Sequence, residues 1–251
     1  MSTQAPGSVA CPRERIYHWT FVVHLWTLTG VAFAVLALRA TVEGDFDTAL
    51  RLTLGVLLVD FTDGTFARAL RVGERMPLIS GEVIDYIHDL VGLTLVPMFL
   101  CWKAGVFLPP YGFPLVVGAT LAATLKYAMK ARLLALGYSL GAPPIFVTVV
   151  LCHLLGLGPL ASTLYAAGLV ALVLLPVPFP ITSLVTTHWK PGWQSITNYL
   201  VVASALPILI YLRDAPRLLY WALFVNVLAQ LTVFPLLLRL GLIAPGFRRE
   251  Y

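Results

Sequence analysis

Four aspartates stand in two pairs beside apolar segments of the chain. Asp60 and Asp63 follow the apolar run TALRLTLGVLLV, and Asp85 and Asp89 lie in the sequence GEVIDYIHD a short distance further on. On helices, residues three or four positions apart share a face, so each pair presents its carboxylates on one side. Carboxylates gathered at membrane depth repel one another unless a cation binds between them. Oxygen ligands without a cluster of His or Cys favour Mg²⁺ or Mn²⁺.

Small residues and an arginine accompany the aspartates. Gly64 and Ala67 continue the helical face of the first pair, Arg68 follows them, and Gly81 lies one turn before Asp85. Small side chains leave a groove in which a ligand can reach the helix backbone, and a guanidinium binds phosphate in a forked contact. Metals, an arginine and a groove suggest a diphosphate ligand. For the small residues alone, close packing of helices is the alternative interpretation.

The composition indicates that these groups are positioned by membrane helices. Of 251 residues, 59% are hydrophobic and 12% are charged, and the mean hydropathy is +0.86. The sequence therefore predicts an all-α, polytopic integral membrane protein with a single domain over residues 1–251. The polar segment 1–16 precedes an apolar run without a signal-peptide cleavage site, so we expect a retained first span. The three cysteines are widely spaced and support neither a disulfide framework nor a zinc site.

About twenty apolar residues cross a bilayer, and this length predicts about eight transmembrane helices. The expected helices lie near residues 18–39, 48–70, 83–105, 112–132, 142–158, 160–179, 194–212 and 217–239. Lysine and arginine concentrate in the segments that share a side with the N-terminus, which favours a cytoplasmic N-terminus. The segment 60–89, with all four aspartates, then lies at the cytoplasmic face. Attraction to anionic lipids accounts for the net charge of +5, so nucleic acid is not an expected partner.

The acidic segment resembles the signature of the CDP-alcohol phosphotransferases. The matching pattern is Asp60-x2-Asp63-Gly64-x2-Ala67-Arg68-x12-Gly81-x3-Asp85-x3-Asp89. The family usually has eight residues between the arginine and the later glycine, and the twelve found here resemble its bacterial phosphatidylcholine synthase branch. The first helix is similar to that branch in its VH-x2-T-x2-G pattern, formed by Val23, His24, Thr27 and Gly30.

This resemblance implies a fold, a reaction and a role for each matching residue. The implied fold is that of the CDP-alcohol phosphotransferases, in a bacterial inner membrane. The implied reaction transfers a phosphatidyl group from CDP-diacylglycerol to choline and releases CMP, with Mn²⁺ or Mg²⁺, two ions in all. Asp89 would be the catalytic base. The metal ligands would be Asp60, Asp63, Asp85 and Asp89, and the CDP-diacylglycerol site would be lined by Gly64, Ala67, Arg68 and Gly81. A homodimer is also an expectation from the family.

A choline site needs aromatic faces or a carboxylate, because a quaternary ammonium donates no hydrogen bonds. The candidates on the cytoplasmic side are Tyr86, Glu82, Tyr17, Trp19, Trp189, Trp193 and Tyr199. Tyrosine and tryptophan also gather at membrane interfaces without binding a ligand. His24 and His88 are interpreted as contacts between helices, with substrate contact as the alternative for His88.

Two other functions fit parts of the sequence. The acceptor alcohol could instead be serine, inositol phosphate or glycerol phosphate, and Arg71, Arg75 and Lys130 keep a phosphorylated acceptor open. A cation-coupled transporter would also have aspartates within the membrane. Transport favours acidic residues distributed across the bilayer and related halves, and this chain has neither.

Overall fold

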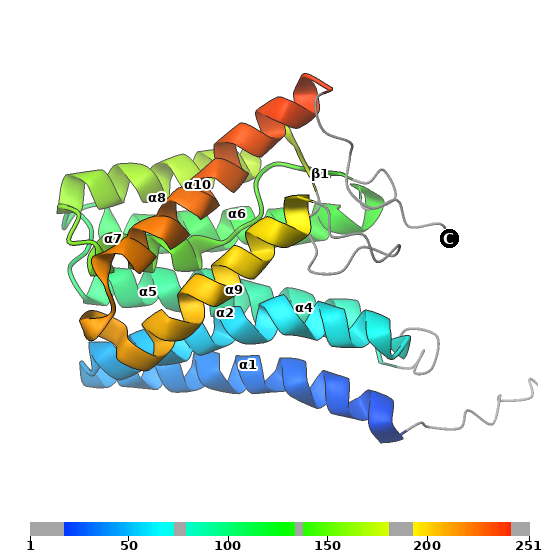
Figure 1. The fold of residues 1–251 in the computed structure, drawn as a ribbon. Helices are drawn as coiled ribbons and strands as arrows, with labels where there is room; N and C mark the ends of the chain where they lie inside the picture. Colours follow the sequence, from blue (N-terminus) through cyan, green and yellow to red (C-terminus); the bar gives the residue numbers. More distant parts are fainter. Residues whose placement is uncertain (1–17, 73–78, 134–137, 181–192, 242–251) are drawn as a thin grey trace, which may run out of the picture.

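A computed structural model describes residues 18–72, 79–133, 138–180 and 193–241 of the chain. The chain forms a bundle of long helices that run side by side (Figure 1). The helices are α1 (His18–Glu43), α2 (Phe46–Ala69), α4 (Gly81–His88), α5 (Val96–Lys103), α6 (Gly112–Leu133), α7 (Val149–Leu154), α8 (Pro159–Leu174), α9 (Trp193–Tyr211) and α10 (Arg217–Arg239). A π-helix, η1 (Asp89–Leu95), joins α4 to α5. Short 3₁₀ turns are η3 (Phe146–Thr148) and η4 (Leu212–Asp214).

The predicted all-α polytopic fold is confirmed. Four helices are long and apolar enough to cross a membrane within the described part of the chain, and they are Phe21–Glu43, Gly81–Lys103, Gly112–Met129 and Arg217–Leu237. Large apolar side chains such as Leu121, Leu164 and Leu218 are exposed on the outside of the bundle. Such a surface suits lipid rather than water. The count of eight crossings and the cytoplasmic segment 1–16 stay predictions, and residues 1–17 lie outside the described residues.

The predicted fifth helix, 142–158, is wrong in its extent. Residues 142–145 are not helical, and the helical part consists of η3 and the six-residue α7. Pro143 and Pro144 explain this, because proline donates no backbone hydrogen bond and disfavours helix in the residue before it. Gly141 has φ +76°, and a Cβ there would lie 2.2 Å from the carbonyl oxygen of Val173, so only glycine fits.

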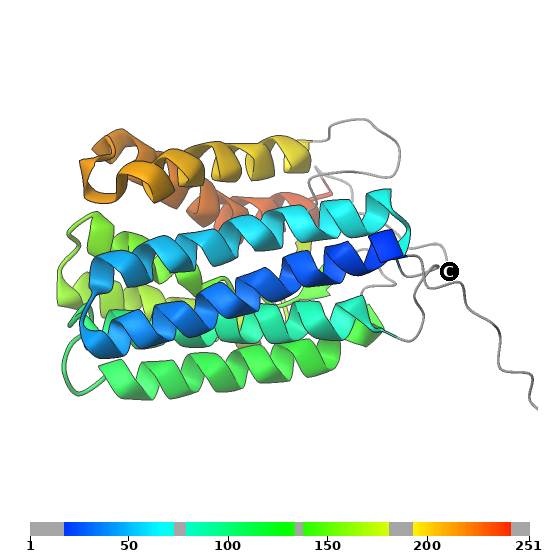
Figure 2. The same cartoon turned by 90° about the horizontal axis from the view of Figure 1, so that it is seen from below.

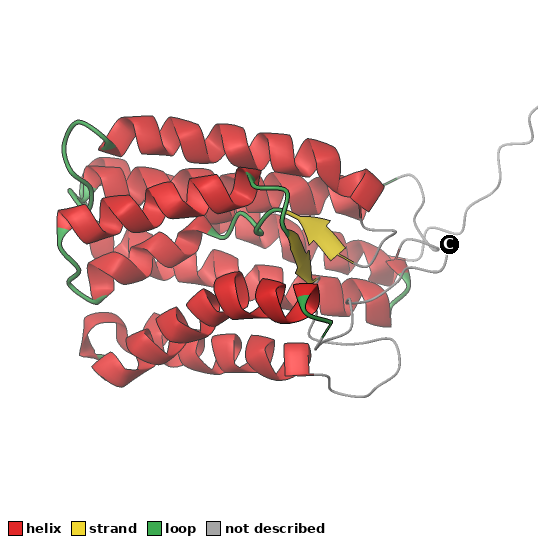
Figure 3. Cartoon of the chain, turned by 90° about the horizontal axis from the view of Figure 1, so that it is seen from above, coloured by secondary structure: helices red, strands yellow, loops and turns green. Residues whose placement is uncertain are grey.

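Two short strands replace helix at the ends of this region. Strand β1 (Tyr138–Leu140) pairs antiparallel with β2 (Pro178–Pro180), and Ser139 lies opposite Phe179. Figure 3 shows them as the yellow arrows at the edge of the helical bundle. The predicted sixth helix, 160–179, accordingly ends early at Leu174, because Pro176 and Pro178 follow.

Helix α1 packs between α2 and the Gly81–Lys103 segment, as Figure 2 shows. Fully buried Ala34, Ala37 and Ala49 let α1 and α2 approach closely. Helix α6 covers the other side of the Gly81–Lys103 segment, and α9 packs against α2. Helices α1, α6 and α9 therefore pack against the two segments that carry the aspartates.

The two ends of the bundle hold different helix termini. The first residues of α1 and α9 lie at the same end of the bundle as the last residues of α10 (Figure 1). Arg39 near the end of α1, Arg51 near the start of α2 and Arg217 at the start of α10 belong to the opposite end. The aspartates lie toward the end at which α2 finishes and α4 begins.

Candidate active site

The structure brings the four aspartates together. One carboxylate oxygen from each of Asp60, Asp63 and Asp85 lies within 4.8 Å of the others, and Asp60 also forms such a group with Asp89 and His88. Asp60 belongs to both groups. Asp63 is buried, and its Oδ2 has no hydrogen-bond partner among the described residues. A buried carboxylate oxygen without a partner is costly, and a bound cation would satisfy it. The donors therefore fit one or two divalent ions.

Close packing at one glycine sets the approach of the two acidic helices. Gly92 in η1 lies against Val56 in α2, so closely that a Cβ on Gly92 would be 2.4 Å from Val56 Cγ1. Asp60 is one helical turn beyond Val56, and Asp89 lies three residues before Gly92. This contact therefore sets how near the two carboxylates come. Asp89 is also the first residue of the π-helix η1, and π-helical turns recur at functional sites.

Helix α1 supplies the other wall of the site through the VH-x2-T-x2-G pattern. The ring of His24 packs over Gly81, where a Cβ would lie 3.1 Å from His24 Cε1. The Thr27 side chain interacts with the carboxylate of Asp63. Gly30 lies under the ring of His88, and a Cβ there would be 2.1 Å from Nε2. All three residues face the acidic segment, so the pattern packs α1 against both α2, at Asp63, and α4, at Gly81 and His88.

Tyr127 in α6 is a site residue that the sequence analysis missed. Its hydroxyl donates a hydrogen bond of 3.1 Å to Asp89 Oδ2. Its ring stacks on Tyr86, with centroids 5.3 Å apart and planes inclined by 25°. The Tyr86 hydroxyl in turn donates to Glu82 on the same helix. The signal in the sequence is the Lys126-Tyr127 pair directly after an apolar stretch of α6, and the structure shows both side chains buried.

For the remaining predicted site residues, the structure describes few contacts or none. Gly64 and Ala67 are half-buried on α2 beyond Asp63. Gly81 packs against His24, and its predicted place in the CDP-diacylglycerol site stays a prediction. Arg68 lies on α2, but its side chain is outside the described residues, as are those of Trp19, Trp193 and Tyr199 on their helices. Tyr17 and Trp189 lie outside the described residues altogether.

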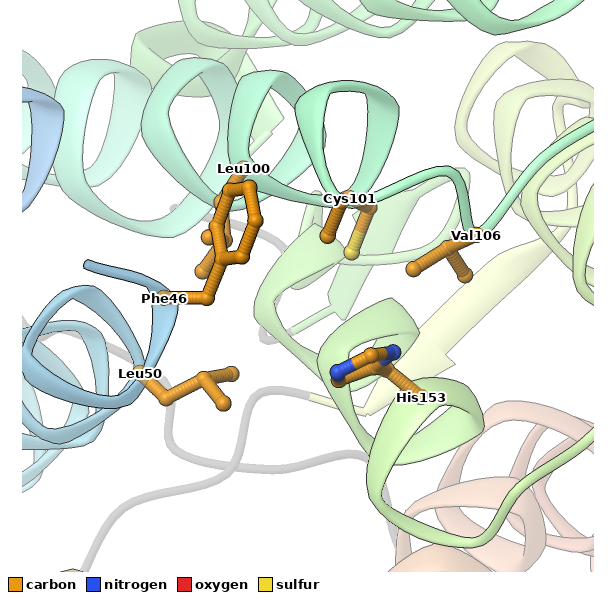
Figure 4. A pocket seen from close by; sticks show the side chains of 7 residues that line it. Phe46, Leu50, Leu100, Cys101, Val106 and His153 are labelled. Atoms are coloured by element: carbon orange, nitrogen blue, oxygen red, sulfur yellow. The ribbon is translucent and has the colours of Figure 1, made fainter. Parts of the chain in front are cut away.

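The described residues also line two apolar pockets. One lies at the opposite end of the bundle, where Phe46 and Leu50 of α2 face Leu100, Cys101 and His153 (Figure 4). It has no carboxylate in its lining. The other lies between α2, α9 and α10, and its lining includes Phe61, Val201 and Val227. Phe61 follows Asp60 in α2, and its side chain lies about 100° from that of Asp60 around the helix, so this pocket borders a different face of α2.

Comparison with known proteins gives a consistent group of relatives, although no family model matches the chain. The chain is 30% identical over 200 residues to a phosphatidylcholine synthase of Pseudomonas aeruginosa, covering 78% of this chain and 83% of that protein. It is 33% identical over 168 residues to the phosphatidylcholine synthase of Bradyrhizobium diazoefficiens, covering 66% of this chain and 62% of that protein. With the Borreliella burgdorferi phosphatidylcholine synthase, identity is 28% over 108 residues, 43% of this chain and 46% of that protein. The chain thus spans about half to two thirds of the latter two relatives.

Proposed function

The chain belongs to the phosphatidylcholine synthase family, and from this premise we propose that it transfers a phosphatidyl group from CDP-diacylglycerol to choline with release of CMP. The observation that carries the proposal is the meeting of Asp60, Asp63, Asp85 and Asp89 from two neighbouring helical segments. Four carboxylates at one place suit a reaction whose donor is a diphosphate bound through divalent cations. The metal is Mn²⁺ or Mg²⁺, with two ions as the proposed number.

The described residues suggest how the reaction would proceed. The bound ions would neutralise the diphosphate and stabilise the charge that develops on the leaving CMP. Asp89 would accept the proton of the incoming hydroxyl, whose oxygen attacks the phosphorus on the lipid side while the bond to CMP breaks. Tyr127 would hold Asp89 in position through its hydrogen bond to Oδ2. Gly64, Ala67, Arg68 and Gly81 would line the CDP site, by resemblance to the family.

The surroundings of the acidic site support a lipid donor. Large apolar side chains such as Leu121, Leu164 and Leu218 are exposed on the outside of the bundle that holds the aspartates. The acyl chains of the donor would stay in the surrounding lipid while its diphosphate lies at the carboxylates. We also propose that the site faces the cytoplasm of a bacterial inner membrane, that residues 1–251 act as a single domain, and that the protein forms a homodimer, as the family resemblance suggests.

The choline site is proposed at Tyr86 and Glu82. Tyr86 is the candidate that lies within the described site, between Asp85 and the Tyr127 ring. An aromatic face and a nearby carboxylate together suit a quaternary ammonium. Tyr17, Trp19, Trp189, Trp193 and Tyr199 remain predictions for the same role, because the structure describes none of their side chains.

Release of CMP tests the proposed function. The purified protein would be given CDP-diacylglycerol with Mn²⁺ or Mg²⁺ and, in parallel, choline, serine, inositol phosphate or glycerol phosphate, with a chelator as the metal-free control. We expect metal-dependent release that choline stimulates, with phosphatidylcholine as the product. Release with another alcohol would keep the phosphotransfer chemistry and reject choline. Absence of metal-dependent release with every alcohol would reject the proposed function, and transport would then become the better explanation for the aspartates.

Replacing Tyr127 with phenylalanine should slow the reaction without preventing donor binding. The variant keeps the ring that stacks on Tyr86 and loses the hydroxyl that donates to Asp89. A hydrogen bond to a charged group is worth about 1.5–3 kcal/mol, so we expect kcat to fall about tenfold or more. The KM for CDP-diacylglycerol should change little.

Tyr165→Phe is the matched control for this substitution. It also removes one tyrosine hydroxyl, which donates to Thr148 Oγ1 at 3.0 Å away from the aspartates. Steady-state kinetics of both variants at saturating choline would make the comparison. Equal kcat values for Tyr127→Phe and the unmodified protein would contradict the positioning role.

A further inference from the structure

His88 is a buried imidazole without a hydrogen-bond partner. Its exposed fraction is 0%, and neither Nδ1 nor Nε2 has a hydrogen-bond partner among the described residues. A buried polar group without a partner costs free energy, so such a group in a folded protein requires an explanation. The sequence favours a simple contact between helices for His88. A contact between helices explains the position of the ring, but it gives neither ring nitrogen a hydrogen-bond partner among the described residues.

The ring lies within metal-binding distance of two of the aspartates. A ring nitrogen of His88 and one oxygen each of Asp60 and Asp89 all lie within 4.8 Å of one another. His88 Nδ1 is 3.7 Å from Asp89 Oδ1. That distance is too long for a hydrogen bond. Two ligands bound to the same ion at about 2.1 Å lie about 3–4 Å apart, so the separation suits a shared cation.

The packing on α1 holds the imidazole in this place. Gly30 leaves room for the ring, because a Cβ at that position would lie 2.1 Å from His88 Nε2. Any side chain larger than hydrogen at residue 30 would therefore displace the ring. The ring is confined between α1 and the acidic segment, and Asp60 and Asp89 lie beside it.

We propose that His88 is a metal ligand, donating an imidazole nitrogen to an ion that it shares with Asp60 and Asp89. The inference rests on the proposed metal-dependent function and deepens it by giving the two ion sites different donors. The group of Asp60, Asp63 and Asp85 offers oxygen alone, whereas the second group offers oxygen and nitrogen. Imidazole suits transition metals better than Mg²⁺, so the second site should select Mn²⁺ over Mg²⁺.

Pulsed electron paramagnetic resonance on bound Mn²⁺ tests the proposal directly. The purified full-length protein in detergent, loaded with Mn²⁺ alone, should show modulation from a nitrogen nucleus coupled to the ion. Protein labelled with ¹⁵N only at histidine should show the pattern of ¹⁵N instead, and this measurement requires no substitution. Absence of nitrogen modulation on bound Mn²⁺, or a pattern unchanged by the histidine label, would overturn the proposal.

Two variants identify the histidine. His88→Gln should remove the nitrogen modulation and weaken binding of the second Mn²⁺ about tenfold or more. Substituting a residue that only hydrogen-bonds to a metal ligand already lowers metal affinity about 10–100-fold. His24→Gln is the matched control, because His24 is also buried beside the site and belongs to neither group of ligands. It should keep the modulation. Modulation that survives His88→Gln would overturn the assignment.

The readout separates this inference from the proposed function. Binding of Mn²⁺ without histidine coupling, in protein that releases CMP, would reject His88 as a ligand and keep the phosphotransferase. Histidine coupling in protein that releases no CMP with any alcohol would keep the ligand assignment and reject the proposed reaction.

Discussion

Asp60→Asn should abolish metal-dependent CMP release. Asp60 is the residue that both groups of potential metal ligands share, so its loss removes an oxygen ligand from each ion at once. An amide is a weaker metal ligand than a carboxylate and does not offset the ionic charge. Loss of a single electrostatic contact to a transition state costs about 10²–10³-fold in kcat, so we expect a fall of about 10³-fold or more.

Asp47→Asn provides the control on the same helix. Asp47 lies in the first turn of α2, thirteen residues before Asp60 and therefore about 20 Å away along the helix axis. The substitution is chemically identical, and kcat should stay within about twofold of the unmodified protein. CMP release at saturating metal and the stoichiometry of bound Mn²⁺ would be measured for both variants. Unchanged turnover and metal binding in Asp60→Asn would show that the acidic site is not the metal centre.

The positions of most helices were predictable because their length and apolarity are local properties of the sequence. Helices α1, α2, α6 and α10 begin and end within a few residues of their predicted bounds. The fifth helix was overestimated because hydropathy does not register the backbone effect of Pro143 and Pro144. The π-helix at Asp89 was not predicted, because no local pattern in the sequence signals it.

The acidic site was predictable for a similar reason. Spacing of three and four residues places each aspartate pair on one helical face, and a short connection lets two antiparallel helices bring the faces together. Tyr127 was not predicted, because its place depends on a contact between helices that are distant in the sequence. For His88 the sequence favours a contact between helices, with contact to the substrate as the alternative. His88 was assigned to packing since its direction differs from that of Asp89 by about 100° around the helix. The π-helix that begins at Asp89 and the space left by Gly30 bring His88 and Asp89 to the same site.

Gly92→Ala should separate the two acidic helices and damage both stability and activity. The new Cβ would lie 2.4 Å from Val56 Cγ1, and valine cannot turn away easily because its side chain is branched at Cβ. Overpacking of this kind costs about 1–3 kcal/mol of folding free energy. Since Asp60 and Asp89 lie within one turn of this contact, a displacement of about 1 Å at the carboxylates should reduce kcat about 10²-fold.

Gly118→Ala controls for the loss of glycine itself. Gly118 lies in α6, and a Cβ there would meet no atom within 4 Å. Alanine stabilises a helix by about 1 kcal/mol relative to glycine, so this variant should unfold at the same temperature or higher. Thermal unfolding in detergent and CMP release would be compared for the two glycine variants. If Gly92→Ala matched Gly118→Ala in both, close packing at Gly92 would not be what positions the carboxylates.

A second substitution can separate lost packing from lost positioning. Val56→Ala removes the methyl groups that the new Cβ would meet, so the double variant Val56→Ala/Gly92→Ala should recover activity that Gly92→Ala alone loses. Residues in direct contact show coupling energies of about 0.5–3 kcal/mol in a double-mutant cycle. Here we expect the double variant to lose less activity than the two single substitutions would lose if their effects added. Val56 is fully buried, so Val56→Ala alone should lower stability while leaving the helices close together. Additive losses in the double variant would mean that Val56 and Gly92 act independently, and the spacing of Asp60 and Asp89 would then need another cause.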